Sequence, residues 1–294
     1  MKEKTTLADR YLYEHFYETC TVESKLSIGC PGVELDADYS WFQVVLCGEK
    51  KCRECEFRFA NQGFYNGKNV FSNNFANQEF VRLKNIRSQE EFEAVCGKIC
   101  EDLRGIIIDG GVSDGSPLEQ FKKLEFVVFE GHRLSRFWNT AKNPKLRMLT
   151  VWINKHLQSL SGLEYAENLE CLQFYKAPSD VGSHRVESFE PLSKLPRLKE
   201  LILSSTGSFD ADMEYLIRIP SLEYLWISPN LFSTESYAKF EAKKFKIFDE
   251  YGIYLEEFHD IHPYGKGKRV MHTAEQKKRY LAQYNEFLQK YREL

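Results

Sequence analysis

Cysteine thiols are the side chains with the clearest chemical potential in this chain, which has 8 of them among 294 residues. Five lie at short spacings that could supply thiolates to zinc, namely Cys47, Cys52, Cys55, Cys96 and Cys100. Cys55, however, shares a period-two face with Phe57 and Phe59, and the last pair lies in an expected helix without flanking turn residues. We therefore interpret these cysteines as buried thiols and predict no metal.

Two other segments carry residue types that bind metals or phosphates. His259 and His262 flank Asp260 and Ile261, and the phrase GKGKRV occupies residues 265–270. We interpret the first as a polar loop and the second as a solvated basic turn, because it lacks the spacing of a P-loop. The sequence contains no serine elbow, paired-carboxylate frame or glycine-rich dinucleotide loop. We therefore predict no catalytic residues and no cofactor.

An internal repeat predicts the elements that would position any site. The phrases LRGIII, LEFVVF, LRMLTV, LECLQF, LKELIL and LEYLWI begin at Leu103, Leu124, Leu146, Leu169, Leu198 and Leu222. Each has apolar residues at its first, fourth and sixth positions, and the starts are 21 to 29 residues apart. A fixed period of this length indicates a repeat architecture, in which each strand stacks on the one before.

The phrases LRMLTVWIN and LEYLWISPN resemble the leucine-rich-repeat consensus through its ninth position. Asn154 and Asn230 stand where that family uses an asparagine ladder to satisfy turn backbone groups, whereas the other repeats carry Gly111, His132, Ala177 and Thr206. The resemblance covers about residues 103–245 and implies an irregular array. The fold class it implies is α/β, a leucine-rich-repeat solenoid with a parallel sheet on its concave side and helices on its convex side. It also implies a surface for binding a protein, as in bacterial-type cytoplasmic relatives.

Alternation along each strand predicts which side chains point where. Positions four and six should point into the solenoid, and positions three, five and seven should line the opposite, concave face. The segments between strands carry apolar anchors three residues apart, which predicts helical returns on the convex side. These anchors are Leu157, Leu160 and Leu163; Phe189, Leu192 and Leu195; and Met213, Leu216 and Ile219. The polar stretch KAPSDVGSHRVE in the fourth repeat predicts a loop insertion, either a tolerated one or an extra contact loop.

The ends of the array should be covered. We predict an N-terminal cap region over residues 1–87, with a helix at 5–18 and short strands at 41–47 and 55–59. The solenoid is predicted over residues 88–258, with a last strand at 252–258. A basic loop with an amphipathic helix follows over residues 259–294. Capping boxes at Ser88 to Glu91 and at Thr273 to Gln276 predict two helix starts. The last helix carries an apolar stripe of Tyr280, Tyr284, Phe287, Leu288 and Tyr291. We expect it to dock as a C-terminal cap, with a free partner helix as the alternative.

The concave face is rich in aromatic residues, which are enriched at interface hot spots. The predicted partner-binding residues are Phe126, Glu130, Met148, Trp152, Gln173, Tyr175, Tyr224 and Trp226. Asp109 and Glu130 would add an acidic flank. The alternative is that the N-terminal cap or the tail folds over this face and makes the aromatics core residues.

Charge and composition limit the classes of partner. The net charge of -3 gives no overall attraction to nucleic acid or membranes, although residues 264–294 carry 8 Lys or Arg against 3 Glu, a net +5. No long apolar run or leader pattern occurs, so we predict a cytoplasmic protein that does not bind membranes. We predict a non-catalytic scaffold that binds a protein. Two alternatives stay open: an enzyme or zinc-dependent module in the N-terminal region whose substrate the repeats present, and nucleic-acid binding through the basic tail.

Overall fold

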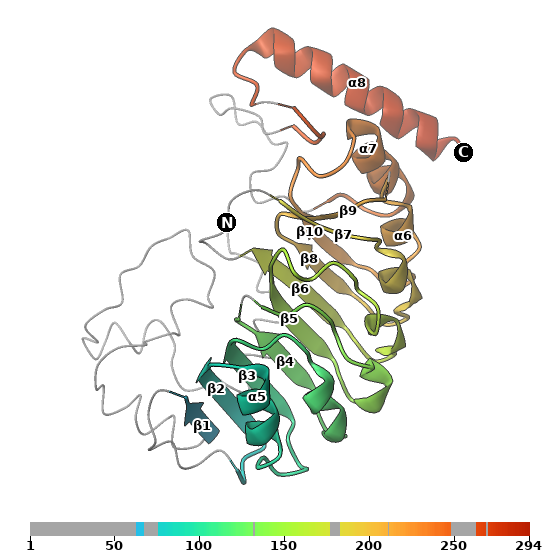
Figure 1. Ribbon diagram of the computed structural model, residues 1–294. Helices are drawn as coiled ribbons and strands as arrows, with labels where there is room; N and C mark the ends of the chain where they lie inside the picture. Colours follow the sequence, from blue (N-terminus) through green and yellow to red (C-terminus); the bar gives the residue numbers. More distant parts are fainter. Residues whose placement is uncertain are drawn as a thin grey trace, which may run out of the picture.

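The computed structural model describes residues 63–67, 76–131, 133–176, 183–210, 212–247, 263–268 and 270–294. Its main sheet has eight strands, all parallel and arranged in chain order (Figure 1). They are β1 (Gly63–Asn66), β2 (Phe80–Ile86), β3 (Gly105–Gly110), β4 (Phe126–Phe129), β5 (Met148–Ile153), β6 (Cys171–Lys176), β8 (Glu200–Leu203) and β10 (Tyr224–Ile227). Such a parallel sheet, with helical turns between its strands, is a mixed α/β architecture that fits a leucine-rich-repeat-like fold.

The strands pair with matching repeat positions side by side. Ile106 of β3 is in register with Val127, which is in register with Leu149, and the row continues through Leu172 and Leu201 to Leu225. All six fourth-position residues are buried in one hydrophobic core, as are the sixth-position residues from Ile108 to Ile227. The predicted inward direction of positions four and six is therefore confirmed. Each such side chain contributes roughly 1.5 to 3 kcal/mol to folding through burial.

The return segments are shorter and tighter than the predicted helices. Four of them are 3-10 turns, η2 (Ser116–Gln120), η3 (Thr140–Lys142), η4 (Leu163–Tyr165) and η5 (Glu190–Lys194), and one is a short α-helix, α6 (Glu214–Ile217). The predicted anchors of these segments are all buried in the core. The predicted apolar pattern is therefore present, and a spacing of three residues is compatible with the three residues per turn of the 3-10 segments.

The sheet begins earlier in the chain than predicted. β2 pairs with β3 in the shared register, with Val81 beside Ile106, and both Val81 and Leu83 belong to the core. β1 pairs in turn with β2. The predicted boundary between residues 87 and 88 therefore lies inside the sheet. The pattern missed β2 because its first position is Gln78 rather than a leucine. The predicted helix at 5–18 and strands at 41–47 and 55–59 lie outside the described residues.

The predicted helix after β2 is α5 (Gln89–Cys96), and its cap differs slightly from prediction. The Ser88 side chain accepts a hydrogen bond from the backbone N–H of Glu91, as a capping box requires. The Glu91 carboxylate, however, accepts from the backbone N–H of Arg87 at 2.8 Å. The second half of the motif is therefore displaced by one residue.

A ladder of alternating charges runs along the edge where the strands begin. The second positions of successive repeats are Arg104, Glu125, Arg147, Glu170 and Lys199. Arg104 pairs with Glu125 at 2.7 Å, and Glu170 pairs with both Arg147 at 3.1 Å and Lys199 at 3.3 Å. Each partly exposed pair contributes at most about 1 kcal/mol to stability. If a strand were paired with the next strand but one, however, two like charges would lie side by side. The ladder therefore favours the observed order of the strands.

The loop insertion and the C-terminal segment add smaller elements (Figure 1). The insertion leads into β7 (His184–Val186), which pairs with β9 (Thr206–Ser208). Further along, α8 (Ala274–Arg292) packs against α7 (Thr234–Lys243), and Tyr280 and Tyr284 are buried between the helix and the core. Both hydrogen bonds of the capping box at Thr273 and Gln276 are present, which confirms that predicted start. The predicted strand at 252–258 lies outside the described residues. None of the described helices is long and apolar enough to span a membrane.

The two predicted ladder asparagines have different environments. Asn154 is buried, its Nδ2 donates to the carbonyl of Leu134 at 3.2 Å, and its Oδ1 accepts from the backbone N–H of His156 at 2.8 Å. Asn230 is exposed, and its side chain makes no hydrogen bond to another described residue. The contact with turn backbone groups that was expected of both asparagines is therefore found at Asn154 and not, among the described residues, at Asn230.

We expect Asn154→Ala to lower the free energy of unfolding by about 1 to 3 kcal/mol. The substitution leaves the Leu134 carbonyl and the His156 N–H without their hydrogen-bond partner. Asn230→Ala is the matched control and should change stability by less than about 0.5 kcal/mol. Urea unfolding followed by circular dichroism measures both, and equal effects of the two substitutions would contradict the assignment.

Candidate functional site

The predicted concave face consists of the side chains at positions three, five and seven of the repeats. The return segments lie along one side of the sheet (Figure 1). Because strand side chains alternate, the residues at positions three, five and seven point to the other side, away from the core. Shared register aligns them in rows across the strands. Met148 lies beside Phe126, and Trp152 beside Tyr175. The rows therefore bring together side chains that are more than twenty residues apart in sequence.

The eight predicted binding residues divide into two groups by exposure. Phe126, Met148, Gln173 and Glu130 are buried, the last with 6% of its surface exposed. Trp152, Tyr175, Tyr224 and Trp226 are half-buried. Trp152 and Tyr175 are register neighbours, whereas Tyr224 and Trp226 both belong to β10. The binding role of all eight stays a prediction.

An aromatic pair that the sequence pattern missed spans the amino-terminal part of this face. Phe80 of β2 and Phe126 of β4 stack with ring centroids 6.5 Å apart. The residue between them on β3 is Gly105, which is in register with both. Because glycine has no side chain, the two rings meet above it. The Arg104 guanidinium lies 5.4 Å from the Phe80 ring.

A buried polar network crosses three strands of the concave face. The Thr150 hydroxyl donates to Gln173 Oε1 at 3.0 Å, and Gln173 Nε2 donates to Glu200 Oε1 at 3.2 Å. The Cys171 thiol contributes a weaker hydrogen bond to the same Glu200 oxygen at 3.4 Å. All four side chains are buried. The network fixes the rotamers of Gln173 and Glu200 and leaves Gln173 engaged with its neighbours rather than available to a partner.

An ion pair joins β2 to β4 on the same face. Arg82 donates to Glu130 Oε2 at 3.0 Å, and each side chain has only 6% of its surface exposed. Burial raises the pKa of Glu130; the Arg82 charge opposes this shift, and the Asp109 charge adds to it. Arg82 was not predicted as a site residue because β2 was not recognised. A search that required apolar residues only at the fourth and sixth positions would find β2, through Val81 and Leu83.

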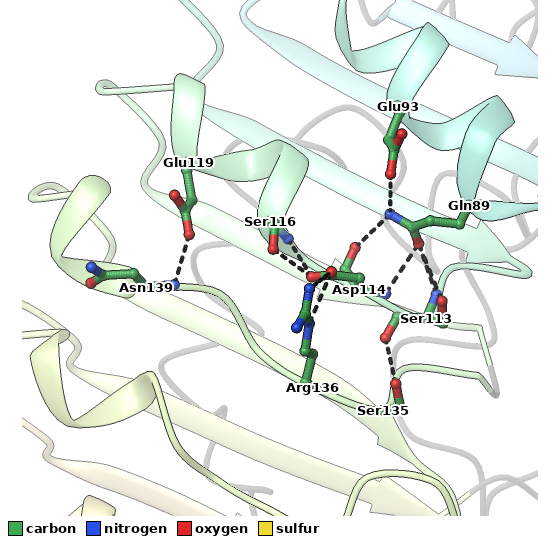
Figure 2. A network of polar contacts seen from close by, with 9 residues as sticks. All are labelled: Gln89, Glu93, Ser113, Asp114, Ser116, Glu119, Ser135, Arg136 and Asn139. Carbon is green, nitrogen blue, oxygen red and sulfur yellow. Dashed lines mark hydrogen bonds and ion pairs between the residues drawn. The ribbon is translucent and has the colours of Figure 1, made fainter.

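Figure 2 shows a second polar network, at the turn that follows β3. Gln89 of α5 accepts hydrogen bonds through Oε1 from the backbone N–H groups of Ser113 and Asp114, both at 3.1 Å. Asp114 accepts from the Ser116 N–H at 2.9 Å and pairs with Arg136. Burial raises the pKa of Asp114, but the bonds from Arg136 and Ser116 outweigh it and hold that pKa below its ordinary value. The network ties turns to one another, and we interpret it as structural.

The described residues contain no group of three or more side chains that could hold a metal ion. Cys47, Cys52 and Cys55 lie outside them, as do His259 and His262. Within them, Cys96 is buried, which raises the pKa of its thiol, and the Cys100 thiol donates to the carbonyl of Gln78 at 3.5 Å. The predicted interpretation of this pair as core thiols therefore suits Cys96 best.

No family model matches this chain. No curated protein matches it either. Among solved structures, internalin C2 from Listeria monocytogenes is similar at 18% identity, over 56% of this chain and 76% of that one, with a TM-score of 0.36. At that identity and TM-score the likeness says nothing about function.

The basic tail is partly committed to contacts within the chain. Lys290 pairs with Glu235 of α7 at 2.7 Å, and Arg279 pairs with Glu275 within α8. Lys266, Lys268 and Lys278 are exposed. The Lys290 ammonium also lies 4.9 Å from the centre of the Tyr291 ring. Binding of nucleic acid through the tail stays a prediction.

Proposed function

We propose that this chain is a leucine-rich-repeat solenoid that binds a protein partner through its concave face and carries out no chemistry of its own. The array would begin by Gly63 and continue to about residue 258, with the segments before and after it covering its ends. The observation that carries the proposal is the set of four half-buried aromatics, Trp152, Tyr175, Tyr224 and Trp226, on a face whose other side chains are mostly buried.

Several physical features support a binding role for this face. Trp152 and Tyr175 are register neighbours on adjacent strands, so the sheet holds their backbones side by side before a partner arrives. Rigid aromatic side chains lose little conformational entropy on binding and bury a large area. Phe126, Met148 and Gln173 are buried, so they would not contact the partner directly. We also propose a cytoplasmic location, which suits the free thiols of Cys96, Cys100 and Cys171.

The test is affinity capture from host lysate followed by a binding measurement with the purified partner. The test variant carries Trp152→Ser, Tyr175→Ser and Trp226→Ser. The control variant carries Tyr165→Ser and Phe209→Ser, which remove aromatics that are 52% and 70% exposed and lie outside the concave face. We expect wild type and control to bind alike and the test variant to lose about 30-fold or more in affinity, as hot-spot residues do.

Circular dichroism and thermal unfolding of each variant separate binding from folding. If the folded test variant retains the same partner with unchanged affinity, the concave face is not the binding site. If the test variant unfolds while the control remains folded, the aromatics are core residues and the proposal fails.

A further inference from the structure

The seventh positions of four adjacent strands bring two acids beside two aromatic rings. Asp109 on β3 is followed by Glu130 after β4, Trp152 on β5 and Tyr175 on β6. Glu130 donates its backbone N–H to the carbonyl of Ile108 at 2.8 Å, and Trp152 pairs in register with Tyr175. Neighbouring strands are about 4.8 Å apart, so each side chain is next to the following one. We call these four residues the row-seven cluster.

The Glu130 carboxylate lacks a hydrogen-bond donor on one side. Its Oε2 is held by Arg82, but its Oε1 is buried and receives no hydrogen bond within the described part of the chain. Buried carboxylate oxygens almost always have a donor, and leaving one without costs about 1 to 3 kcal/mol. The nearby charge of Asp109 opposes ionisation of Glu130 further. The row-seven cluster therefore contains a buried acceptor that has no hydrogen-bond donor among the described residues, and a positive charge nearby would stabilise it.

Asp109 is the accessible member of the acidic pair. Its side chain is half-buried, and no hydrogen bond or ion pair joins it to another described residue. Two cations lie close by, but Arg82 is engaged by Glu130, and Lys84 forms no ion pair with either carboxylate among the described residues. A cation from outside would meet Asp109 first and then approach Glu130.

The two rings add a second attraction for the same kind of ligand. The faces of Trp and Tyr rings attract ammonium and guanidinium groups, with about 0.5 to 2 kcal/mol per contact. Trp152 is the aromatic next to the acids in the row, and both rings are half-buried. Acids and ring faces side by side suit a long side chain with a cationic end, because its methylene groups can lie on the rings while its charge reaches the carboxylates.

We infer that the row-seven cluster recognises a lysine or arginine side chain presented by the partner protein. This inference rests on the proposed function and specifies the chemistry of its ligand. Asp109 forms an ion pair with the charged end of that side chain, whose methylene groups pack on the Trp152 and Tyr175 rings. The buried Glu130 carboxylate adds negative charge nearby. An acidic or purely apolar segment would leave Asp109 desolvated without a counter-ion and would bind less well.

The probe is a random peptide library displayed on phage and selected on the immobilised 294-residue chain. Peptides are retained for study if they bind wild type but not the Trp152→Ser, Tyr175→Ser variant. We expect these peptides to be enriched in lysine or arginine. In one synthesised peptide, replacing the basic residue by norleucine should weaken binding about tenfold, and Asp109→Asn in the protein should do the same. Combining both changes should cost little more than either alone, because they remove the same contact.

Two variants serve as controls. Glu101→Gln removes an exposed acid outside the row-seven cluster and should leave peptide affinity unchanged. Glu130→Gln keeps the side-chain volume and should weaken binding less than Asp109→Asn. Thermal unfolding of each variant establishes that it is folded.

The possible results separate the two proposals. Peptides that require Trp152 and Tyr175 but are acidic or uncharged, or that bind equally well to Asp109→Asn, overturn the inference and leave the proposed function intact. If no selected peptide requires the two rings, the concave face binds no such segment, and the proposed function fails together with the inference.

Discussion

Replacing Arg82 with methionine is expected to lower the free energy of unfolding by about 3 to 5 kcal/mol. The substitution keeps most of the side-chain volume but leaves the Glu130 carboxylate buried with neither oxygen paired to a cation. An isolated buried charge is far more costly than a buried pair. Urea unfolding of the variant and wild type measures the difference.

Two comparisons isolate the electrostatic cause. The double variant Arg82→Met, Glu130→Leu removes both charges and should recover most of the lost stability. Arg136→Met breaks the pair with Asp114, in which the arginine side chain is 69% exposed, and should have a much smaller effect because water screens that pair. A double variant as unstable as Arg82→Met would show that packing, not charge, causes the loss.

The pH dependence has a definite sign. A carboxyl group with a raised pKa in the folded state binds its proton more tightly when folded, so it favours folding below its unfolded pKa and loses that contribution as pH rises through its folded pKa. Without Arg82 the folded pKa of Glu130 should be raised further. The deficit of Arg82→Met should therefore be largest at neutral pH and shrink in acid, where a protonated Glu130 needs no counter-ion. A deficit that is independent of pH would contradict this.

Substituting Gly131 by alanine should lower the free energy of unfolding by about 3 kcal/mol. A Cβ atom on Gly131 would overlap the backbone of Gly110, chiefly its carbonyl oxygen, and a Cβ on Gly110 would in turn overlap the backbone of Ile86. Gly110 also has a φ of 143°, in the region that favours glycine. The backbones at the ends of these strands thus lie too close together to admit a side chain. An alanine could be accommodated only if the strand ends moved apart.

Gly97→Ala is the matched control for that prediction. Gly97 follows α5 with a φ of -64°, and the nearest atom to an added Cβ would be 3.6 Å away. Alanine at this position should be neutral or stabilise slightly, because it reduces the conformational freedom of the unfolded chain. Equal losses in thermal unfolding for Gly97→Ala and Gly131→Ala would contradict the close-approach explanation.

A backbone contact at Gly111 explains why one repeat needs no ladder asparagine. In the repeat that ends near Gly111, the Gly111 N–H donates directly to the carbonyl of Ile86 at 2.6 Å. Because this hydrogen bond joins the two backbones directly, no side-chain amide is needed to bridge the turns. Asn154 bridges the later turn, where its amide reaches the carbonyl of Leu134. The departure from the consensus at position nine was visible in the sequence, but the contact that replaces the amide depends on how closely the turns approach.

Local patterns determined the core-facing residues of this protein. Alternation within a strand decides which side chains share a face, so Leu149 and Val151 could be assigned inward from their positions alone. Helix starts were similarly local, since the Thr273 and Gln276 cap involves only neighbouring residues. The return anchors were also predicted, but their spacing of three residues did not distinguish the 3-10 returns from the α-helical return α6, because short turns of both helix types share that spacing.

Only the tertiary structure decided which side chains of the concave face are exposed and which are paired. Phe126 and Trp152 occupy equivalent faces of successive strands, yet one is buried and the other half-exposed. The burial of a side chain depends on everything that surrounds it in space, and alternation specifies only the direction in which it points. The Arg82 pair with Glu130 joins residues 48 apart across an intervening strand, so it exists only because the strands share one register. Direction was therefore a property of the sequence, whereas exposure and pairing were properties of the assembled sheet.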